Sequence, residues 1–242
     1  MTPVITLTGA ILDPIMRADP VGPRITYYDD ATGARIECST VTLANWAAKT
    51  ANLLRDELGA TAGTRVSVLL PAHWQTAAVL FGVWWAGCEA VLPDSADAGA
   101  EIALCTLDRL AEADDAVGTG EVAVLSLDPF GMPVPDLPVG VTDYATAVRV
   151  HGDQIVPEPD PGPALAGRSV TEVLAAAQAA AAQRGLQPTD RVLSSAPWDT
   201  AKALVDNMLA VYVTGASLVQ VANPDPALLA RRIETEKITR EL

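Results

Sequence analysis

The chain has 242 residues, with 16 Lys and Arg against 30 Asp and Glu, which gives a formal net charge of −14. Half of the residues are hydrophobic and 19% are charged, so a packed core is expected rather than a disordered chain. The acidic balance argues against a nucleic-acid binder and against an anionic membrane surface as the partner, because both need clustered Lys and Arg.

The N-terminal stretch and the cysteines predict a cytoplasmic protein. Residues 1–20 have no basic segment ahead of an apolar run, so no signal peptide is expected. The most apolar run, residues 77–88, is too short for a membrane span, which needs about 20 residues. Cys38, Cys88 and Cys105 form no C-x-x-C pair, so neither a disulfide framework nor a cysteine zinc site is expected.

The first half of the chain alternates β-prone runs with helical patterns. Ala31-Thr32-Gly33 predicts a hairpin between the first two runs, and Ser39 or Thr40 can cap the helix that follows. Strands are expected at residues 25–30, 35–38, 65–70, 88–92, 102–107 and 122–127, and helices at about 40–58, 77–86 and 108–116. This alternation predicts a mostly parallel sheet with helices on its faces.

The second half begins with irregular chain. Residues 128–138 are rich in turns, residues 141–150 fit a short helix and strand, and residues 151–168 collect prolines and glycines. Ser169 and Glu172 form a capping box, and the helix they start runs to about Arg184. Further strands are expected at residues 191–196, 216–222 and 237–242, with helices capped by Asp199 and by Asp225 between them.

These elements predict an α/β fold of layered, mostly parallel sheets with helices on both faces. We expect a single domain over residues 1–242, or two lobes at about 22–150 and 169–242 joined by the Pro- and Gly-rich segment 151–168.

Four stretches, taken together, resemble a known family. Residues 58–71, with Gly63-Thr64-Arg65-Val66 and a closing Leu70-Pro71, are similar to G-x-x-x-G-D-R-V-A-x-x-L-P-N of the adenylate-forming superfamily (acyl-CoA synthetases, luciferases and peptide-synthetase adenylation domains, also called AMP-binding enzymes). Residues 81–92 resemble the helix-to-strand segment that follows, and residues 186–197 resemble L-x-x-x-D-x-x-L-x-x-x-P. Residues 215–239 resemble the next G-A-x-x-V and D-P pieces, so the order matches the N-terminal domain of that superfamily.

The resemblance also identifies what this chain lacks. In the family, a Ser/Thr/Gly-rich loop ending in P-K-G binds the ATP phosphates just before the helix that begins here at Ser169. Residues 160–168 have several prolines and no Lys, which leaves Gly167 and Arg168 as the candidates for phosphate binding. Arg168 either holds a phosphate at the helix N-terminus or is a surface arginine. Trp198 stands near the family's aromatic–His pair, and either lines a vestigial pocket or packs in the core.

No catalytic residue and no metal site are predicted. The family's C-terminal part supplies an acidic Mg²⁺ residue, a ribose-binding Asp and a lid Lys, and no residue of this chain matches them. His73 and His151 lie in different segments, so structural or solvated histidines are expected rather than a metal site.

The functional prediction is a truncated, degenerate acyl-CoA synthetase-like protein that is non-catalytic and binds an acyl or nucleotide-like ligand or regulates a partner. The alternative is an AMP-binding ligase-type enzyme that is active only with a partner chain supplying the missing motifs. A third hypothesis is a structural interaction protein without a ligand. ATP, AMP and CoA are implied by the resemblance alone. An incomplete sheet predicts an exposed edge, and therefore a homo-oligomer or a protein partner.

Overall fold

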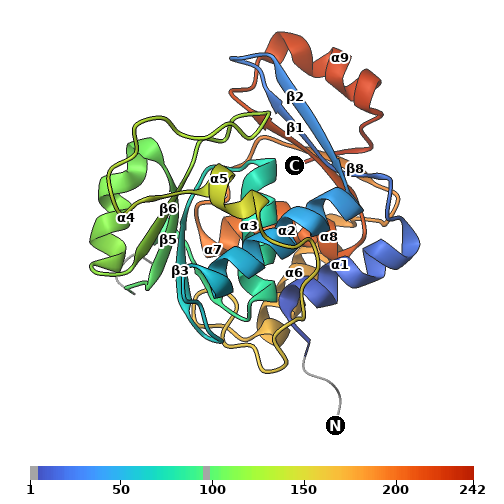
Figure 1. The fold of residues 1–242 in the computed structure, drawn as a ribbon. Helices are drawn as coiled ribbons and strands as arrows, with labels where there is room; N and C mark the ends of the chain where they lie inside the picture. The colour runs from blue at the N-terminus through green and yellow to red at the C-terminus, as the bar shows by residue number, and fades with distance from the viewer. Residues whose placement is uncertain (1–4, 95–98) are drawn as a thin grey trace.

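The computed structural model describes residues 5–94 and 99–242, and its strands form two five-stranded sheets there (Figure 1). Residues 1–4 of the N-terminal stretch discussed above lie outside the described residues. Sheet A has the order β10-β8-β9-β1-β2, formed by Arg240–Glu241, Arg191–Ser194, Ser217–Ala222, Pro23–Asp29 and Ala34–Ser39. Sheet B has the order β4-β3-β5-β6-β7, formed by Glu89–Val91, Arg65–Leu69, Ile102–Thr106, Glu121–Leu125 and Thr142–Asp143.

Neighbouring strands are parallel in both sheets except in the β1–β2 hairpin, which confirms the mostly parallel prediction. The hairpin is not in the same sheet as β3, the strand that follows it in sequence. It pairs with β9 in sheet A, where Tyr27 is opposite Gln220. Sheet A therefore joins residues from both ends of the chain. The division into one domain or two lobes stays a prediction.

Helices cover both faces of the sheets, as predicted. The helices are α1 (Leu7–Ala18), α2 (Thr40–Asp56), α3 (Trp74–Trp85), α4 (Leu110–Val117), α5 (Tyr144–Arg149), α6 (Val170–Arg184), α7 (Ala201–Leu204), α8 (Ala210–Val213) and α9 (Pro226–Glu236), with a 3-10 turn at Leu107–Arg109 and a π-helical turn at Val205–Leu209. In Figure 1, α2 and α3 lie between the sheets, α4 covers the outer face of sheet B, and α9 covers the outer face of sheet A. None of the helices within the described ranges combines the length and apolar content that a bilayer crossing requires.

The local signals of the sequence are confirmed at several helix ends. The Ser39 side chain caps α2, and Ser169 and Glu172 form the expected capping box at the start of α6. Gly185 ends α6 in the left-handed conformation.

Three local features differ from expectation. Helix α1 was not predicted, although Leu7, Ile11 and Ile15 share one of its faces and are buried. Thr200, rather than Asp199, caps α7, because its hydroxyl accepts from the Ala203 amide at 3.0 Å. Within residues 141–150 the short strand precedes the helix.

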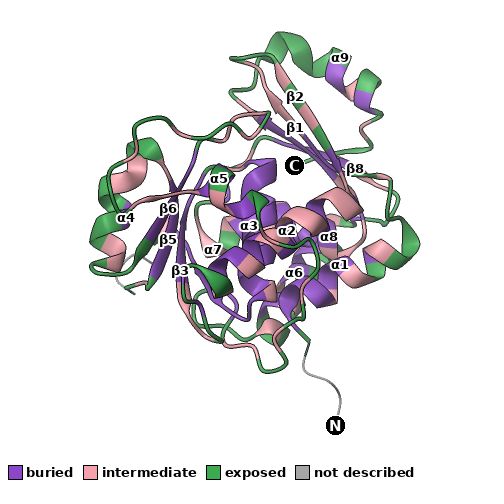
Figure 2. Cartoon of the chain, in the orientation of Figure 1, coloured by how far each residue is buried: buried purple, intermediate pink, exposed green. Residues whose placement is uncertain are grey.

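The core lies between the sheets, and Figure 2 shows the buried residues concentrated on α2 and α3. These two helices approach closely at Gly82, where an added Cβ would be 2.6 Å from the Cβ of Thr50. Thr50 is fully buried, and its hydroxyl lies 2.7 Å from the Tyr144 hydroxyl and donates to the Trp46 carbonyl. Thr50 therefore cannot move away from a side chain added at position 82.

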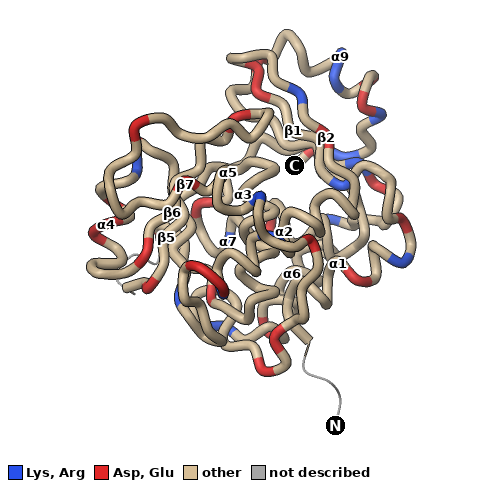
Figure 3. The backbone as a smooth tube through the Cα atoms, in the orientation of Figure 1, with Lys and Arg blue, Asp and Glu red and all other residues tan. Residues whose placement is uncertain are grey.

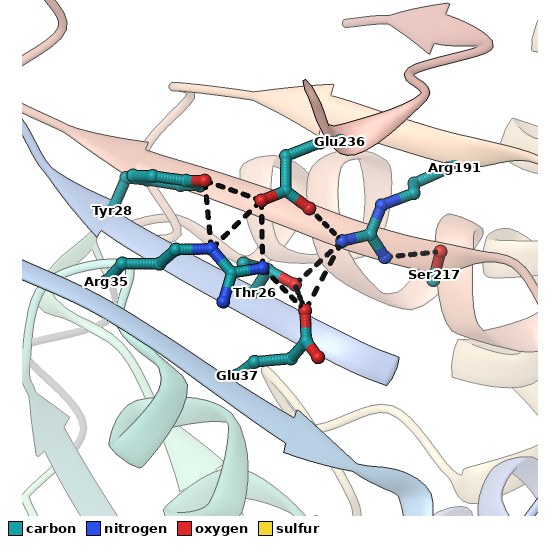
Figure 4. A network of polar contacts seen from close by, with 7 residues as sticks. All are labelled: Thr26, Tyr28, Arg35, Glu37, Arg191, Ser217 and Glu236. Atoms are coloured by element: carbon teal, nitrogen blue, oxygen red, sulfur yellow. Dashed lines mark hydrogen bonds and ion pairs between the residues drawn. The ribbon is translucent and has the colours of Figure 1, made fainter. Parts of the chain in front are cut away.

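The outer face of sheet A is held to α9 mainly by charge. Figure 4 shows the Glu236 carboxylate accepting hydrogen bonds from Tyr28, Arg35 and Arg191, with Thr26 and Glu37 beside them. The Glu236 side chain is 4% exposed. Burial alone would raise the pKa of Glu236, but the hydrogen bonds from Tyr28, Arg191 and Arg35 outweigh it and hold the pKa below its ordinary value.

The Gly82→Ala variant tests the close packing of α2 on α3. Alanine favours helix, but the clash with Thr50 and with the Ala47 carbonyl should produce a net loss of stability on the order of 1–2 kcal/mol. Urea unfolding measures this loss. The control is Gly152→Ala, where the nearest atom to the new Cβ is 3.8 Å away and a change within about 0.5 kcal/mol is expected. Equal stability of both variants would contradict the close contact.

The Glu236→Gln variant tests the charged contact under α9. Because the folded-state pKa is below the ordinary value of 4.5, this carboxylate stabilises the fold above that pH, and the stabilisation is lost as pH falls through and below it. We expect E236Q to lose about 1–3 kcal/mol at neutral pH and to show a shallower decline on acidification. Urea unfolding at several pH values measures both, with exposed Glu234→Gln as control. Identical pH profiles for wild type and E236Q would rule the contact out as a stabiliser.

Candidate functional site

A row of polar side chains lies at the carboxyl ends of the strands in sheet A. Ser194, Gln220 and Tyr27 are in register on β8, β9 and β1, so they share the face that is turned to the helical layer. The Gln220 amide donates to the Ala196 carbonyl at 3.2 Å, just beyond the end of β8. In α/β folds this edge of a parallel sheet is the usual place for ligands.

His73 and Trp198 complete this group, which we call the carboxyl-edge cluster (Tyr27, His73, Ser194, Trp198 and Gln220). His73 follows β3 of sheet B, and its Nδ1 accepts from the Gln75 amide at 3.2 Å at the start of α3. Its ring centroid lies 4.2 Å from that of Tyr27, in an edge-on arrangement. The cluster therefore draws on both sheets. Trp198 is 2% exposed and follows Ala196 by two residues.

The carboxyl-edge cluster carries no positive charge at neutral pH. Burial lowers the pKa of His73 to about 3, which keeps its imidazole neutral. Burial, with the nearby Asp29, raises the pKa of Tyr27 to about 12, so its hydroxyl stays protonated. The cluster can donate and accept hydrogen bonds but cannot neutralise phosphate charge.

Two buried polar atoms of the cluster have no hydrogen-bond partner within the described part of the chain. They are the indole Nε1 of Trp198, a donor, and the side-chain Oε1 of Gln220, an acceptor. A buried polar atom without a partner typically costs about 1–3 kcal/mol.

The segment before α6 is hydrogen-bonded to β4 and to the chain leading into it. The Gly162 amide donates to the Gly87 carbonyl at 3.1 Å, and the Ala164 amide donates to the Arg168 carbonyl at 2.7 Å. The Ala164 carbonyl accepts from the Ala90 amide at 3.0 Å and from the Trp84 indole at 2.8 Å. The segment thus lies against the sheet, with its backbone already paired.

The tight turn that follows places the backbone amide of Gly167 next to a carboxylate. The Gly167 amide donates to Glu89 Oε1 at 2.6 Å, and the other carboxylate oxygen of Glu89 lies 3.4 Å from Arg65 Nε. Gly167 has φ +71, which glycine adopts without strain. The Gly167 amide is therefore already occupied by an acidic side chain.

The three candidate residues from the sequence lie on different parts of the fold. Gly167 contacts Glu89, the first residue of β4 in sheet B, whereas Trp198 is buried beyond the end of β8 in sheet A. Arg168 is exposed, and its guanidinium donates to the Glu172 carbonyl of α6 at 2.9 Å. The sequence did not single out Gln220 or Glu89. Gln220 becomes relevant through its register across sheet A, and Glu89 through the turn at Gly167 that lies against β4. No local sequence pattern encodes either contact.

The other titratable residues have local roles. Within residues 5–94 and 99–242, no three His, Cys, Asp or Glu side chains are grouped so that they could hold a metal ion. His151 Nε2 lies 2.9 Å from Glu57 Oε1 on the outside of α2, far in sequence from His73. The three cysteines are buried and free, and burial raises the pKa of each thiol to about 12.

The sequence relative that decides the family is a protein of Mycobacterium tuberculosis described as a TIGR03089 family protein. It is 70% identical to this chain over 246 aligned residues, which cover all of both chains. The chain belongs to the TIGR03089 family. No family model matches the chain.

Solved structures confirm the family resemblance at the level of the fold. The Brucella canis acyl-CoA synthetase superposes with a TM-score of 0.79 at 18% identity, covering 98% of this chain and 47% of that one. An anthranilate CoA ligase solved with anthranoyl-AMP gives 0.74 at 15% identity, with 100% and 50% covered. The N-terminal domain of FACL13 from Mycobacterium tuberculosis gives 0.70 at 17% identity, with 98% and 62% covered. The TIGR03089 chain thus has the fold of part of an acyl-CoA synthetase N-terminal domain, and it spans about half the length of the full synthetases that it matches.

The His73→Asn variant tests whether the cluster is neutral. Asn keeps the cap on α3, but it cannot take up a proton on unfolding. Because the folded pKa of His73 lies far below its ordinary 6.5, the wild type should lose about 2 kcal/mol more than H73N between about pH 7.5 and pH 5. Urea unfolding at the two pH values measures the difference. Equal losses would mean that the folded protein protonates His73 freely.

Proposed function

We propose that this chain is a non-catalytic, ligand-binding module built on the acyl-CoA synthetase fold, and that it does not form acyl-adenylates by itself. The observation that carries this proposal is the hydrogen bond from the Gly167 amide to the Glu89 carboxylate. In the resemblance described above, residues 160–168 take the place of the phosphate loop.

The contacts of this segment disfavour a triphosphate. Adenylation needs preorganised donors and positive charge around the phosphates, because negative charge grows there in the transition state. Here the amides of Gly162, Ala164 and Gly167 are already paired, and the Ser169 amide donates to the Glu172 carboxylate at 2.9 Å. A phosphate at this turn would meet the carboxylates of Glu89 and Glu172 instead of free donors. The residues present therefore do not fit ATP.

The carboxyl-edge cluster supports binding of an uncharged group. The Trp198 indole can donate to a carbonyl oxygen, and Gln220 Oε1 can accept from an amide or hydroxyl. An amide or ester of an acyl compound offers such a carbonyl next to an apolar chain. A neutral acyl derivative is therefore the proposed ligand class, in preference to a nucleotide.

Pyrophosphate exchange into ATP tests the catalytic part of the proposal. Purified full chain with Mg·ATP and a panel of carboxylic acids should give exchange at background, because the phosphate-binding donors are committed elsewhere. A competent acyl-CoA synthetase in the same assay is the positive control. Exchange that follows the protein through size exclusion would overturn the proposal. Exchange that appears only after a second chain is added would favour the partner-completed ligase.

Thermal shift separates ligand binding from a purely structural role. A ligand that binds only the native state raises its stability in proportion to the logarithm of its concentration. We expect acyl amides or esters to raise the midpoint of wild type but not of Gln220→Ala, and ATP and AMP to leave both unchanged. The absence of any shift with acyl compounds would contradict the ligand assigned to the cluster.

A further inference from the structure

A second cavity lies at the opposite end of sheet A from the carboxyl-edge cluster. It has a volume of about 680 Å³, is partly open to solvent, and is bordered by α1 on one side and by the loops that lead into the strands on the other. Pro23, Arg191 and Ser217, which line it, are the first residues of β1, β8 and β9. Drug-sized ligands typically occupy cavities of about 300–1,000 Å³, so this one can hold such a molecule.

One wall of the cavity is an apolar face of α1. Ala10, Ile11, Pro14, Ile15 and Ala18 line it, and their spacing of three to four residues places them on one side of the helix. Ile11 and Ile15 are 2% and 5% exposed, so the cavity borders the hydrophobic core. This wall suits the apolar body of a ligand.

The other end of the cavity contains a buried guanidinium. The Arg24 side chain is 4% exposed, and it donates to the Gly215 and Ala216 carbonyls and to the Thr40 hydroxyl. Its nearest carboxylate oxygen belongs to half-exposed Asp19, and lies 3.6 Å from Nη2. Burial lowers the pKa of Arg24 from its ordinary value. Half-exposed Asp19 is therefore the carboxylate that balances this buried cation, and a ligand anion beside Nη2 would add to that balance.

The other charged residues of the cavity differ in how they are paired. Asp190 is committed to the Gln187 amide and the Thr239 hydroxyl, at 2.8 Å each, and Arg191 is committed to Glu236. Lys237 lines the cavity, and within the described residues its ammonium is in no ion pair. Arg24 and Lys237 thus face Asp19 and Asp190 in the cavity, and the charge of Arg191 is balanced by Glu236. In Figure 3, Lys and Arg positions recur on this side of the molecule, between α9 and α1.

We propose that this cavity binds an amphipathic organic anion, with a single carboxylate or sulfonate near Arg24 and Lys237 and an apolar body against α1. Bound there, the ligand would join α1 to the amino ends of sheet A and so stabilise the fold. This site is separate from the carboxyl-edge cluster, and the proposal does not depend on the proposed function.

Calorimetric titration of the full chain with octanoate, and with 1-octanol as the uncharged analogue, tests the proposal. Wild type should bind one octanoate per chain, at least about fivefold more tightly than 1-octanol. Lys237→Gln should weaken octanoate binding by about fivefold and leave 1-octanol unchanged, since only the charge is removed. Lys202→Gln, an exposed lysine on α7 outside the cavity, is the matched control and should bind both ligands as wild type does.

Filling the cavity tests its location. Ala10→Trp should abolish binding of both ligands. Ala18→Trp, at an exposed position of the same wall, should do the same if the first variant does not fold by circular dichroism. Undiminished octanoate binding by a folded tryptophan variant would overturn the proposed site. Equal affinity of wild type for octanoate and 1-octanol, or no octanoate binding up to about 10 mM, would overturn the proposed ligand.

Discussion

Backbone hydrogen bonds hold residues 160–168 against the β4 region, and the proposed function depends on them. The Ala164 carbonyl accepts from both Ala90 and Trp84, and the Gly162 amide bonds to Gly87, so the segment lies against the sheet before α6 begins. That position brings the Gly167 amide to Glu89. In a loop fixed in this way, the amide donors are already hydrogen-bonded within the protein. An anion would have to compete with a carboxylate for them.

The two ends of sheet A consequently differ in chemistry. At the carboxyl ends lie the neutral side chains of His73 and Tyr27 and, among the described residues, two buried polar atoms without a partner, on Trp198 and Gln220. At the amino ends, Arg24 and Lys237 border a cavity with an apolar wall. The two proposals therefore place a neutral group at the end of the sheet where α/β enzymes usually hold phosphates, and an anion at the opposite end.

The sequence predicted the elements well and their assembly less well. Capping signals such as Ser169 and Glu172, and alternation of strands with helices, act over a few residues, and the structure reproduces them. Helix α1 is the exception: Thr6 caps it and Leu7, Ile11 and Ile15 follow a helical period, but Pro14 lies inside it, where proline normally argues against a helix. The partner of the β1–β2 hairpin, the carboxylate at Gly167 and the cavity beside α1 depend on contacts between residues far apart in sequence.

Amide hydrogen exchange in residues 160–169 tests the central claim most directly. The account predicts slow exchange at the amides of Gly162, Ala164 and Gly167 in the free protein, because each is hydrogen-bonded within the fold, and no change on addition of Mg·ATP. Fast exchange at these amides in the free protein, slowed when Mg·ATP is added, would contradict it, because the segment would then be an open phosphate-binding loop.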